Sequence, residues 1–172
     1  MRTFTYPLIA RFIYRYANIP ITLILLFYIF AALSVVSTHS SNLITVIINA
    51  VLIVVLNRYY FKSYRIFPYK IQVDNEGLHC SDFTFSNKQI KINFEDIDNI
   101  SGGIFSGAQT KPIKISDGRQ NQIIAFSAHI KGHNELLTAI LSKIRKDKYE
   151  EILGKITEMA EEQKRKKDAK KK

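Results

Sequence analysis

Two long apolar stretches without a charged side chain dominate the first third of the sequence. Residues 19–37 read IPITLILLFYIFAALSVVS, and residues 43–57 read LITVIINAVLIVVLN. A helix rises 1.5 Å per residue, so the first stretch would measure roughly 28 Å, which matches the hydrocarbon thickness of a bilayer. The second reaches this length if its helix continues through residue 61, with Arg58 extending toward the headgroups. We therefore predict two transmembrane helices, at about 19–37 and 43–61.

Basic residues border this apolar pair at its outer ends only. Arg11 and Arg15 precede the first stretch, whereas the connection at 38–42 contains no Lys, Arg, Asp or Glu. Short cytoplasmic segments are enriched in Lys and Arg, so this asymmetry predicts a multi-pass protein of the cell inner membrane with both termini in the cytoplasm. The predicted membrane-interface residues are Arg11, Arg15, Arg58, Tyr59, Tyr60, Lys62 and Arg65.

Residues 1–18 combine aromatic, apolar and basic side chains, and we predict that they lie along the inner membrane surface as an interfacial segment. Two other interpretations of the N-terminal region stay open. The apolar pair can form a buried helical hairpin in a soluble protein, although such helices seldom run this long without a charge. A basic segment before an apolar run is also typical of a signal peptide, but no A-x-A cleavage motif follows it.

Asn49 is the one strongly polar side chain well inside a predicted span. An amide in lipid is stabilised by hydrogen bonding to a neighbouring helix, so we predict that Asn49 makes a helix–helix contact within the hairpin or with another protomer. The apolar stretches 19–37 and 43–57 contain no Lys, Arg, His, Asp or Glu, the residue types that a pore or a proton relay requires.

The pattern changes to strands after residue 66. The segment QIKINF at 89–94 alternates polar and apolar side chains, and Asp117-Gly118 divides a strong predicted hairpin. Apolar positions then recur with helical spacing through 136–144, which predicts an amphipathic helix that covers the sheet. The predicted fold class is α+β: a two-helix transmembrane hairpin, an antiparallel sandwich or barrel of about seven strands over 66–146 with a C-terminal capping helix, and a basic helical tail.

Four motifs in this region carry a resemblance to a known family. They are VDNEGLHC at 73–80, INFEDIDNISGGIFSG at 92–107, KPIKISD at 111–117 and HIKGHNELLTAIL at 129–141. Together with the preceding hairpin, they resemble the bacterial pleckstrin-homology-like (PH-like) domains of membrane proteins of unknown function. The resemblance implies a fold and no ligand, because the known members mostly lack an assigned activity.

Phosphoinositide binding, which is frequent among eukaryotic members of the wider fold, does not carry over to this sequence. Those members use basic residues in the first hairpin of the domain. Here the first turn is Asp74-Asn75-Glu76, and its acidic side chains would repel a phosphorylated headgroup.

Residues that could support chemistry are sparse in the sequence. His129 and His133 have the spacing of a helical metal pair, but Gly132 interrupts the helix and no third ligand is near. Cys80 follows His79, yet neighbours in a strand point to opposite faces and cannot easily share a proton. Glu95, Asp96 and Asp98 have no calcium-loop spacing and indicate a solvated turn. We therefore expect no catalytic residue, no metal ligand and no cofactor.

Residues 147–172 form a strongly charged tail. It begins with helical apolar spacing and ends in basic runs at 164–167 and 170–172, so we predict a helix that becomes disordered at its end. Much of the net charge of +10 comes from the two ends, since residues 1–70 contain no Asp or Glu. A basic tail can contact anionic lipid, or nucleic acid without sequence specificity.

These patterns favour a non-enzymatic, membrane-anchored module that binds a protein partner at the inner membrane surface. Its expected partners are the bilayer, one unidentified protein and, through the tail, anionic lipid, with no specific nucleic acid. The alternative is a small accessory subunit of a larger membrane transport or enzyme complex, packed through its hairpin, for which Asn49 is the sequence support.

Overall fold

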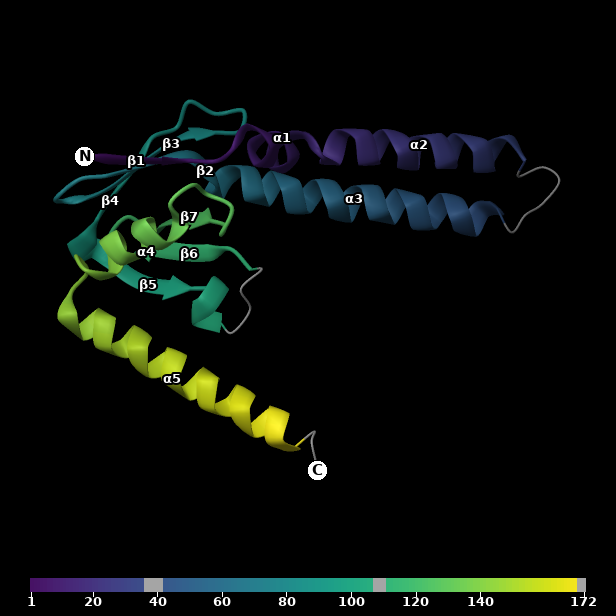
Figure 1. Cartoon of the computed structure of the whole chain (residues 1–172). Helices are drawn as coiled ribbons and strands as arrows, with labels where there is room; N and C mark the ends of the chain where they lie inside the picture. The colour runs from purple at the N-terminus through teal and green to yellow at the C-terminus, as the bar shows by residue number, and fades with distance from the viewer. Residues whose placement is uncertain (36–41, 107–110, 170–172) are drawn as a thin grey trace. The chain divides into compact units, whose positions relative to one another are not determined.

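The computed structural model describes residues 1–35, 42–106 and 111–169. These form five α-helices and two antiparallel sheets, in two compact units (Figure 1). One unit is helical and spans Leu8–Arg65; the other is a sheet domain built from Met1–Pro7 together with Ile66–Lys172. The elements are β1 (Arg2–Thr5), α1 (Leu8–Tyr16), α2 (Asn18–Ser34), α3 (Asn42–Ile66), β2 (Pro68–Val73), β3 (Gly77–Phe83), β4 (Ile90–Asn93), η1 (Phe94–Asp96), β5 (Ile97–Ser101), η2 (Gly103–Ser106), β6 (Ile113–Asp117), β7 (Gln122–Phe126), α4 (His133–Leu141) and α5 (Lys146–Ala169).

The first sheet has the order β1-β2-β3-β4, and its first strand comes from the extreme N-terminus. Thr5 lies opposite Lys70, so β1 and β2 are adjacent although the whole helical unit separates them in sequence. The prediction that 1–18 form one interfacial segment is therefore wrong for residues 2–5. The Thr-Phe-Thr-Tyr alternation at 3–6 is a strand pattern that places Phe4 and Tyr6 in the core.

The second sheet has the order β5-β6-β7 and contains the predicted hairpin. Asp117 ends β6, and its Oδ1 accepts the backbone N–H groups of Arg119 at 2.8 Å and Gln120 at 2.9 Å. The side chain of Asp117 thus stabilises the turn that connects β6 to β7. The N–H of Gly118 also donates to the carbonyl of Asp96 at 3.0 Å, which joins this turn to η1.

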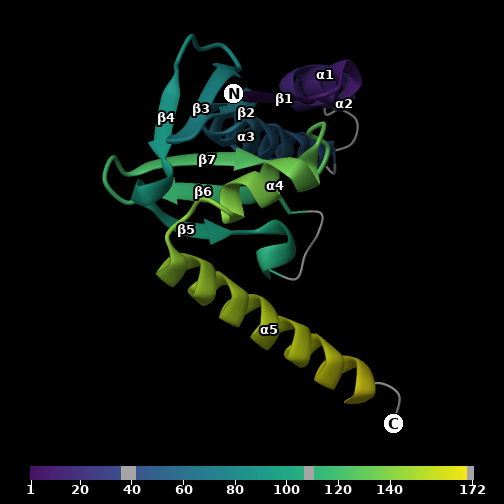
Figure 2. The same cartoon turned by 60° about the vertical axis from the view of Figure 1, so that its left-hand side comes forward.

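The core of the sheet domain lies among the two sheets and α4 (Figure 2). Strand residues alternate between buried and more exposed positions, as in β4 and β6. From α4, Leu136 and Ile140 are fully buried and Leu137 nearly so, which confirms the predicted apolar face. The mixed helix and sheet class is confirmed. The described residues form six strands after residue 66, where about seven are predicted, and β1 from the N-terminus is the seventh strand.

The helical unit contains three helices. A bend of 41° separates α1 from α2, and α3 lies alongside α2 (Figure 1). The observed helices only partly match the predicted spans, since α2 begins one residue earlier and α3 extends beyond residue 61. The predicted end of the first span at 36–37 and most of the connection 38–42 lie outside the described residues.

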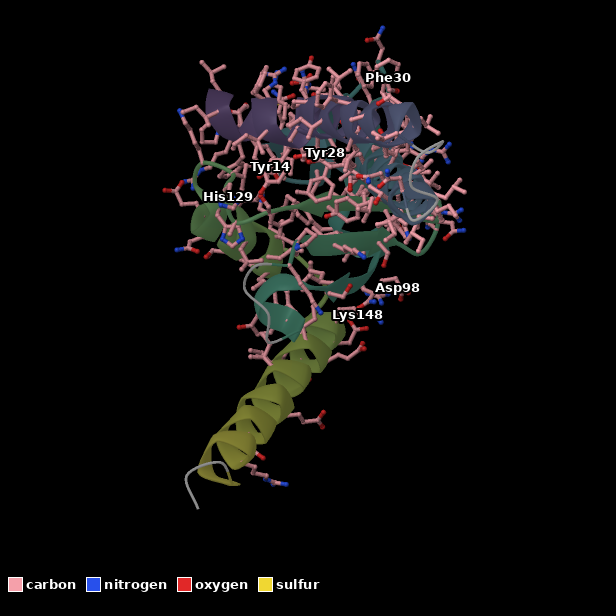
Figure 3. All side chains as sticks on the ribbon, turned by 90° about the vertical axis from the view of Figure 1, so that its right-hand side faces the viewer. Tyr14, Tyr28, Phe30, Asp98, His129 and Lys148 are labelled. Carbon is pink, nitrogen blue, oxygen red and sulfur yellow. The ribbon has the colours of Figure 1, made fainter. Side chains whose placement is uncertain are left out.

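The tail is one continuous helix, α5, from Lys146 to Ala169. Ile152 is buried, and Lys148 forms ion pairs with Asp98 of β5 at 3.3 Å and with Glu151 at 3.1 Å (Figure 3). The predicted helix is confirmed, whereas the predicted disorder does not extend to residues 164–169, which are helical. Residues 170–172 lie outside the described part of the chain.

Candidate functional site

The helix α1 is amphipathic, with its apolar face exposed. Leu8, Ile9, Phe12 and Ile13 recur with the spacing of one helical face, and at least half of each side chain is accessible. The predicted interface residue Arg11 lies on the other side and is half-buried. A short helix with one apolar and one basic face is typical of a segment that lies in a membrane interface.

The helix α3 is long and apolar enough to cross a bilayer by itself, and none of its most apolar window is buried in the structure. With 17 residues, α2 is too short to count as a span of its own. Together with α1, as one bent pair, it is long and apolar enough to cross a bilayer. The core helix of a soluble protein would bury such a surface. The side chains exposed on α2 include Phe27, at 68%, and Phe30, at 74%. Figure 3 labels Phe30 on this helix.

A polar cluster joins α2 to α3 at one end of the helical unit. The amide of Asn57 donates to the hydroxyl of Thr22 at 3.0 Å and accepts from the amide of Asn18 at 3.0 Å. The hydroxyl of Tyr64 lies 2.8 Å from Asn18 Oδ1 and 2.7 Å from the carbonyl of Arg15, and these two acceptors share its single proton. The cluster fixes the last turns of α3 against the start of α2.

Asn49 does not belong to this cluster. Its amide donates to the carbonyl of Thr45, one turn earlier in the same helix, at 2.8 Å. The side-chain hydrogen bonds described between α2 and α3 join Asn57 to Asn18 and Thr22, and Tyr64 to Asn18. The helix–helix contact of Asn49 stays a prediction. Asn18 is the first residue of α2, and its side-chain amide donates to Asn57 of α3.

The predicted interface residues gather at the end of the helical unit that carries the polar cluster. Arg15 is tied to Tyr64 through its carbonyl, and the rings of Tyr59 and Tyr60 meet edge to face at 5.9 Å. Arg11 and Arg15 belong to α1, whereas Arg58, Tyr59, Tyr60, Lys62 and Arg65 occupy the last part of α3. Residues that precede and residues that follow the apolar pair in the sequence thus lie at the same end of the helical unit.

A groove of about 580 Å³ lies in the sheet domain between β1, the β2–β3 turn and α4. Arg2 and Asp74 line one side, and Glu135, Thr138 and Ser142 line the other. Binding sites for small segments and ligands have volumes of this order. Charges of both signs and hydroxyl groups therefore face the same cavity.

The end of this groove is fixed by Lys143. Its ammonium donates to the carbonyl of Asp74 at 2.6 Å and to Asn75 Oδ1 at 3.2 Å, and it lies 5.6 Å from the centre of the Phe94 ring. These contacts attach α4 to the β2–β3 turn. The acidic turn at 74–76 therefore helps to hold the end of α4, because its oxygen atoms accept hydrogen bonds from the Lys143 ammonium.

The groove lies beside β1, which is the edge strand of the first sheet. In an antiparallel pair, the N–H and C=O of one residue point to the same side, and successive residues alternate. The carbonyl of Thr5 points away from β2, because it accepts the N–H of Lys131 at 3.0 Å. The backbone of Thr3, two residues earlier, therefore also points away from β2, toward the side that α4 flanks.

Asp74 and His79 form a polar pair beside the groove. His79 Nε2 lies 2.7 Å from Asp74 Oδ2, and Asp74 Oδ1 accepts the N–H groups of Gly77 and Glu76. The hydrogen bonds from Gly77 and Glu76, with a smaller effect of His79, lower the pKa of Asp74 from 3.8 to about 2. This carboxylate is held as an acceptor within a turn.

The remaining candidate groups are placed apart from one another. Burial raises the pKa of the Cys80 thiol to about 12, so this cysteine is unreactive at neutral pH, and His79 faces Asp74 instead. His129 Nδ1 lies 3.5 Å from Ser127 Oγ, whereas the ring of His133 lies 6.0 Å from that of Phe126. Within the described ranges, no three His, Cys, Asp or Glu side chains are grouped to hold a metal ion.

No protein family, no curated protein and no solved structure matches this chain.

Sequence reasoning missed two features that matter here, the edge strand β1 and the cluster around Asn57. The first had a local signal in the alternation of Thr3, Phe4, Thr5 and Tyr6. The second had none, because the partners of Asn57 lie 39 and 35 positions away in the sequence.

Proposed function

We propose that this chain is a membrane-anchored interaction module, with a cytoplasmic PH-like sheet domain that binds an extended segment of a partner protein in the groove beside β1. The unburied apolar surface of α3 carries the proposal, because water is a poor solvent for it and lipid is a good one. The amphipathic α1 and the bent α1–α2 pair are consistent with an interfacial helix that leads into a second span.

The pairing of β1 with β2 supports an even number of crossings. These strands precede and follow residues 8–65 and are neighbours in one sheet, so both lie on the same side of any membrane. If α3 crosses once, the chain must cross again between β1 and α3, which only residues 6–41 can provide. This argument is independent of the basic residues that predict the cytoplasmic side.

The PH-like assignment is supported by the order of elements in the sheet domain. Four antiparallel strands are followed by three more and then by a helix whose apolar face enters the core. This agrees with the resemblance of the four sequence motifs. In this proposal the helical unit is an insertion between the first and second strands of the domain.

The geometry of the groove supports the binding of a protein segment. An extended peptide can add to the edge strand β1, and its side chains would then meet Thr138 and Ser142 of α4. None of the described groups combines a nucleophile with a base in this groove. The accessory-subunit alternative still depends on Asn49, whose amide N–H donates to Thr45 within its own helix.

The anchor and its orientation can be tested by cysteine labelling in intact cells. Cys80 is buried and has a raised thiol pKa, so the native chain provides an unlabelled background. Ser40→Cys should react with a membrane-impermeant maleimide from outside, and Lys131→Cys only after the membrane is permeabilised. Labelling of both variants from outside, or recovery of the protein in the soluble fraction, would contradict the proposed membrane anchor.

The groove can be tested with a photo-crosslinking residue in the full-length chain in its native membrane. Placed at Thr138, which is exposed in the groove, the crosslinker should give one discrete protein adduct. Placed at Ile123, which is 45% exposed on β7 away from the groove, it should give none. Equal adducts from both positions, or none from Thr138, would contradict binding at this site.

A further inference from the structure

One end of the first sheet is marked by the places where the chain leaves for residues 8–65 and returns from them. Thr5, the last residue of β1, lies opposite Lys70, and Pro68, the first residue of β2, lies opposite Phe83. The β3–β4 turn, which follows Phe83, therefore lies at the same end. We call this the junction end of the sheet domain.

The β3–β4 turn presents an aromatic ring at the junction end. Phe85 is 76% exposed, whereas Phe83 and Thr84 beside it are each 4% exposed. The turn is held by the N–H of Ser86, which donates to the carbonyl of Phe83 at 3.4 Å, and by the Thr84 hydroxyl, 3.4 Å from that of Tyr69. A well-anchored turn thus holds one large apolar side chain outward.

Phe85 also has an unusual backbone conformation. Phe85 has φ +55°, in the left-handed region that a residue with a large side chain seldom adopts. Tyr149, the other aromatic residue of the sheet domain with large exposure, is 38% exposed, half as much as Phe85. A large apolar side chain is thus held at the surface by a turn with a rarely adopted backbone conformation.

The charges at the junction end are mostly positive. Lys88 follows Phe85 in the same turn and is exposed, and Lys131 is exposed where its N–H meets the carbonyl of Thr5. Lys70 lies opposite Thr5, and the acidic Asp82 precedes Phe83 at the end of β3. A basic rim around an apolar tip is complementary to the anionic headgroups and acyl boundary of a membrane surface.

We propose that the junction end is a lipid-contact surface, in which Phe85 enters the interfacial layer of the bilayer and Lys88 and Lys131 contact anionic headgroups. The inference rests on the proposed anchor. Pro68 lies two positions beyond Ile66, the end of α3, and paired strands place Phe83 about 5 Å from Pro68. Two extended residues add about 7 Å, so the tip of the turn is within reach of the headgroup layer.

Tryptophan fluorescence tests this contact in the full-length chain, which contains no native tryptophan. Phe85→Trp would be reconstituted in vesicles of phosphatidylcholine and phosphatidylglycerol, with bromine on the acyl chains near the headgroup as the quencher. We expect at least about two-fold stronger quenching of this variant than of Tyr149→Trp, because aromatic side chains in the interface are shielded from water. Tyr149 follows Lys148 in α5, and Lys148 is paired with Asp98 near the start of β5.

A third variant separates the failure of this inference from the failure of the anchor. Phe27 is exposed on α2, so Phe27→Trp should be quenched by bromine placed deep in the acyl chains. Quenching of the Phe27→Trp variant without quenching of the Phe85→Trp variant would overturn the lipid contact and leave the anchor standing. Absence of quenching in both variants would overturn both.

Two further measurements address charge and folding. Replacing Lys88 and Lys131 together by Gln should reduce the quenching of the Phe85→Trp variant, and unchanged quenching would exclude a role for these cations. A nitroxide at Asn87→Cys, beside an intact Phe85, reports on the same turn if the Phe85→Trp variant is unstable. It should be more accessible to oxygen than to a water-soluble nickel chelate, and the reverse order would contradict the proposal.

Discussion

Thr3 and Gln72 face each other across the β1–β2 ladder, and the Gln72 amide lies 3.4 Å from the Thr3 hydroxyl although 69 positions separate them in the sequence. Between them the chain forms the entire helical unit. The sheet domain is therefore closed by a strand that is synthesised before the helices and can pair only after β2 has formed.

The sheet domain should fold without the helical unit if β1 is kept. Replacing residues 8–65 by a short Asn-Gly turn joins the two strands as a hairpin, and the product should be soluble without detergent and unfold cooperatively. The fragment 66–172, which lacks the buried Phe4 and Tyr6, should be less stable by at least about 3 kcal/mol. Urea unfolding followed by circular dichroism compares the two, and equal stability would show that β1 contributes little.

Asn57 should matter more than Asn49 for the helical unit. Asn57→Leu removes the hydrogen bonds to Thr22 and from Asn18, and should destabilise the unit by about 1 kcal/mol in detergent micelles. Asn49→Leu removes a bond within one helix and serves as the matched control, with a smaller effect. Thermal unfolding in the same detergent measures both. A larger effect of Asn49→Leu would instead point to a contact with another protomer.

Acid should destabilise the β2–β3 turn through Asp74. Its folded pKa of about 2 lies below the ordinary value of 3.8, so the ionised carboxylate stabilises the fold above about pH 4, and this contribution is lost as the pH falls toward 2. Asp74→Asn can still accept the N–H groups of Glu76 and Gly77 but does not titrate. Melting temperatures measured from pH 6 to pH 2 should therefore fall less steeply for this variant. Parallel curves would assign the acid sensitivity to other groups.

Docking of α5 should depend on Ile152. This side chain is 6% exposed, so Ile152→Ala should weaken the contact by about 2 kcal/mol and raise amide hydrogen exchange along the helix. Leu153, its neighbour, is 44% exposed, and Leu153→Ala is the control that should leave exchange nearly unchanged. Equal exchange in both variants would mean that the ion pairs of Lys148 hold the helix.

Much of the fold follows from local patterns in the sequence. The apolar runs predict the helices α2 and α3, and the alternation around Ile90 and Ile92 predicts a strand whose inward residues are buried. Asp117-Gly118 predicts the β6–β7 hairpin, and the spacing of Leu136 and Ile140 predicts the buried face of α4. Each of these signals lies within a few residues of the structure that it specifies.

The prediction for residues 1–18 was incomplete because a short strand has little signal of its own. Four residues of alternation next to a basic, aromatic helix are easily read as part of that helix. The contact between Asn18 and Asn57 has no local signal either, since position along a span says nothing about which side chain faces the neighbouring helix.

The sequence by itself determined which segments are apolar, which are strands and which are charged, because periodicity and hydropathy are local properties. Only the tertiary structure decided that β1 completes a sheet beyond the helices, that Asn18 and Asn57 meet, and that Phe85 stands at the junction end. Strand pairing and helix contacts depend on residues far apart in the chain, and the free energy that selects among possible partners comes from the packed core as a whole.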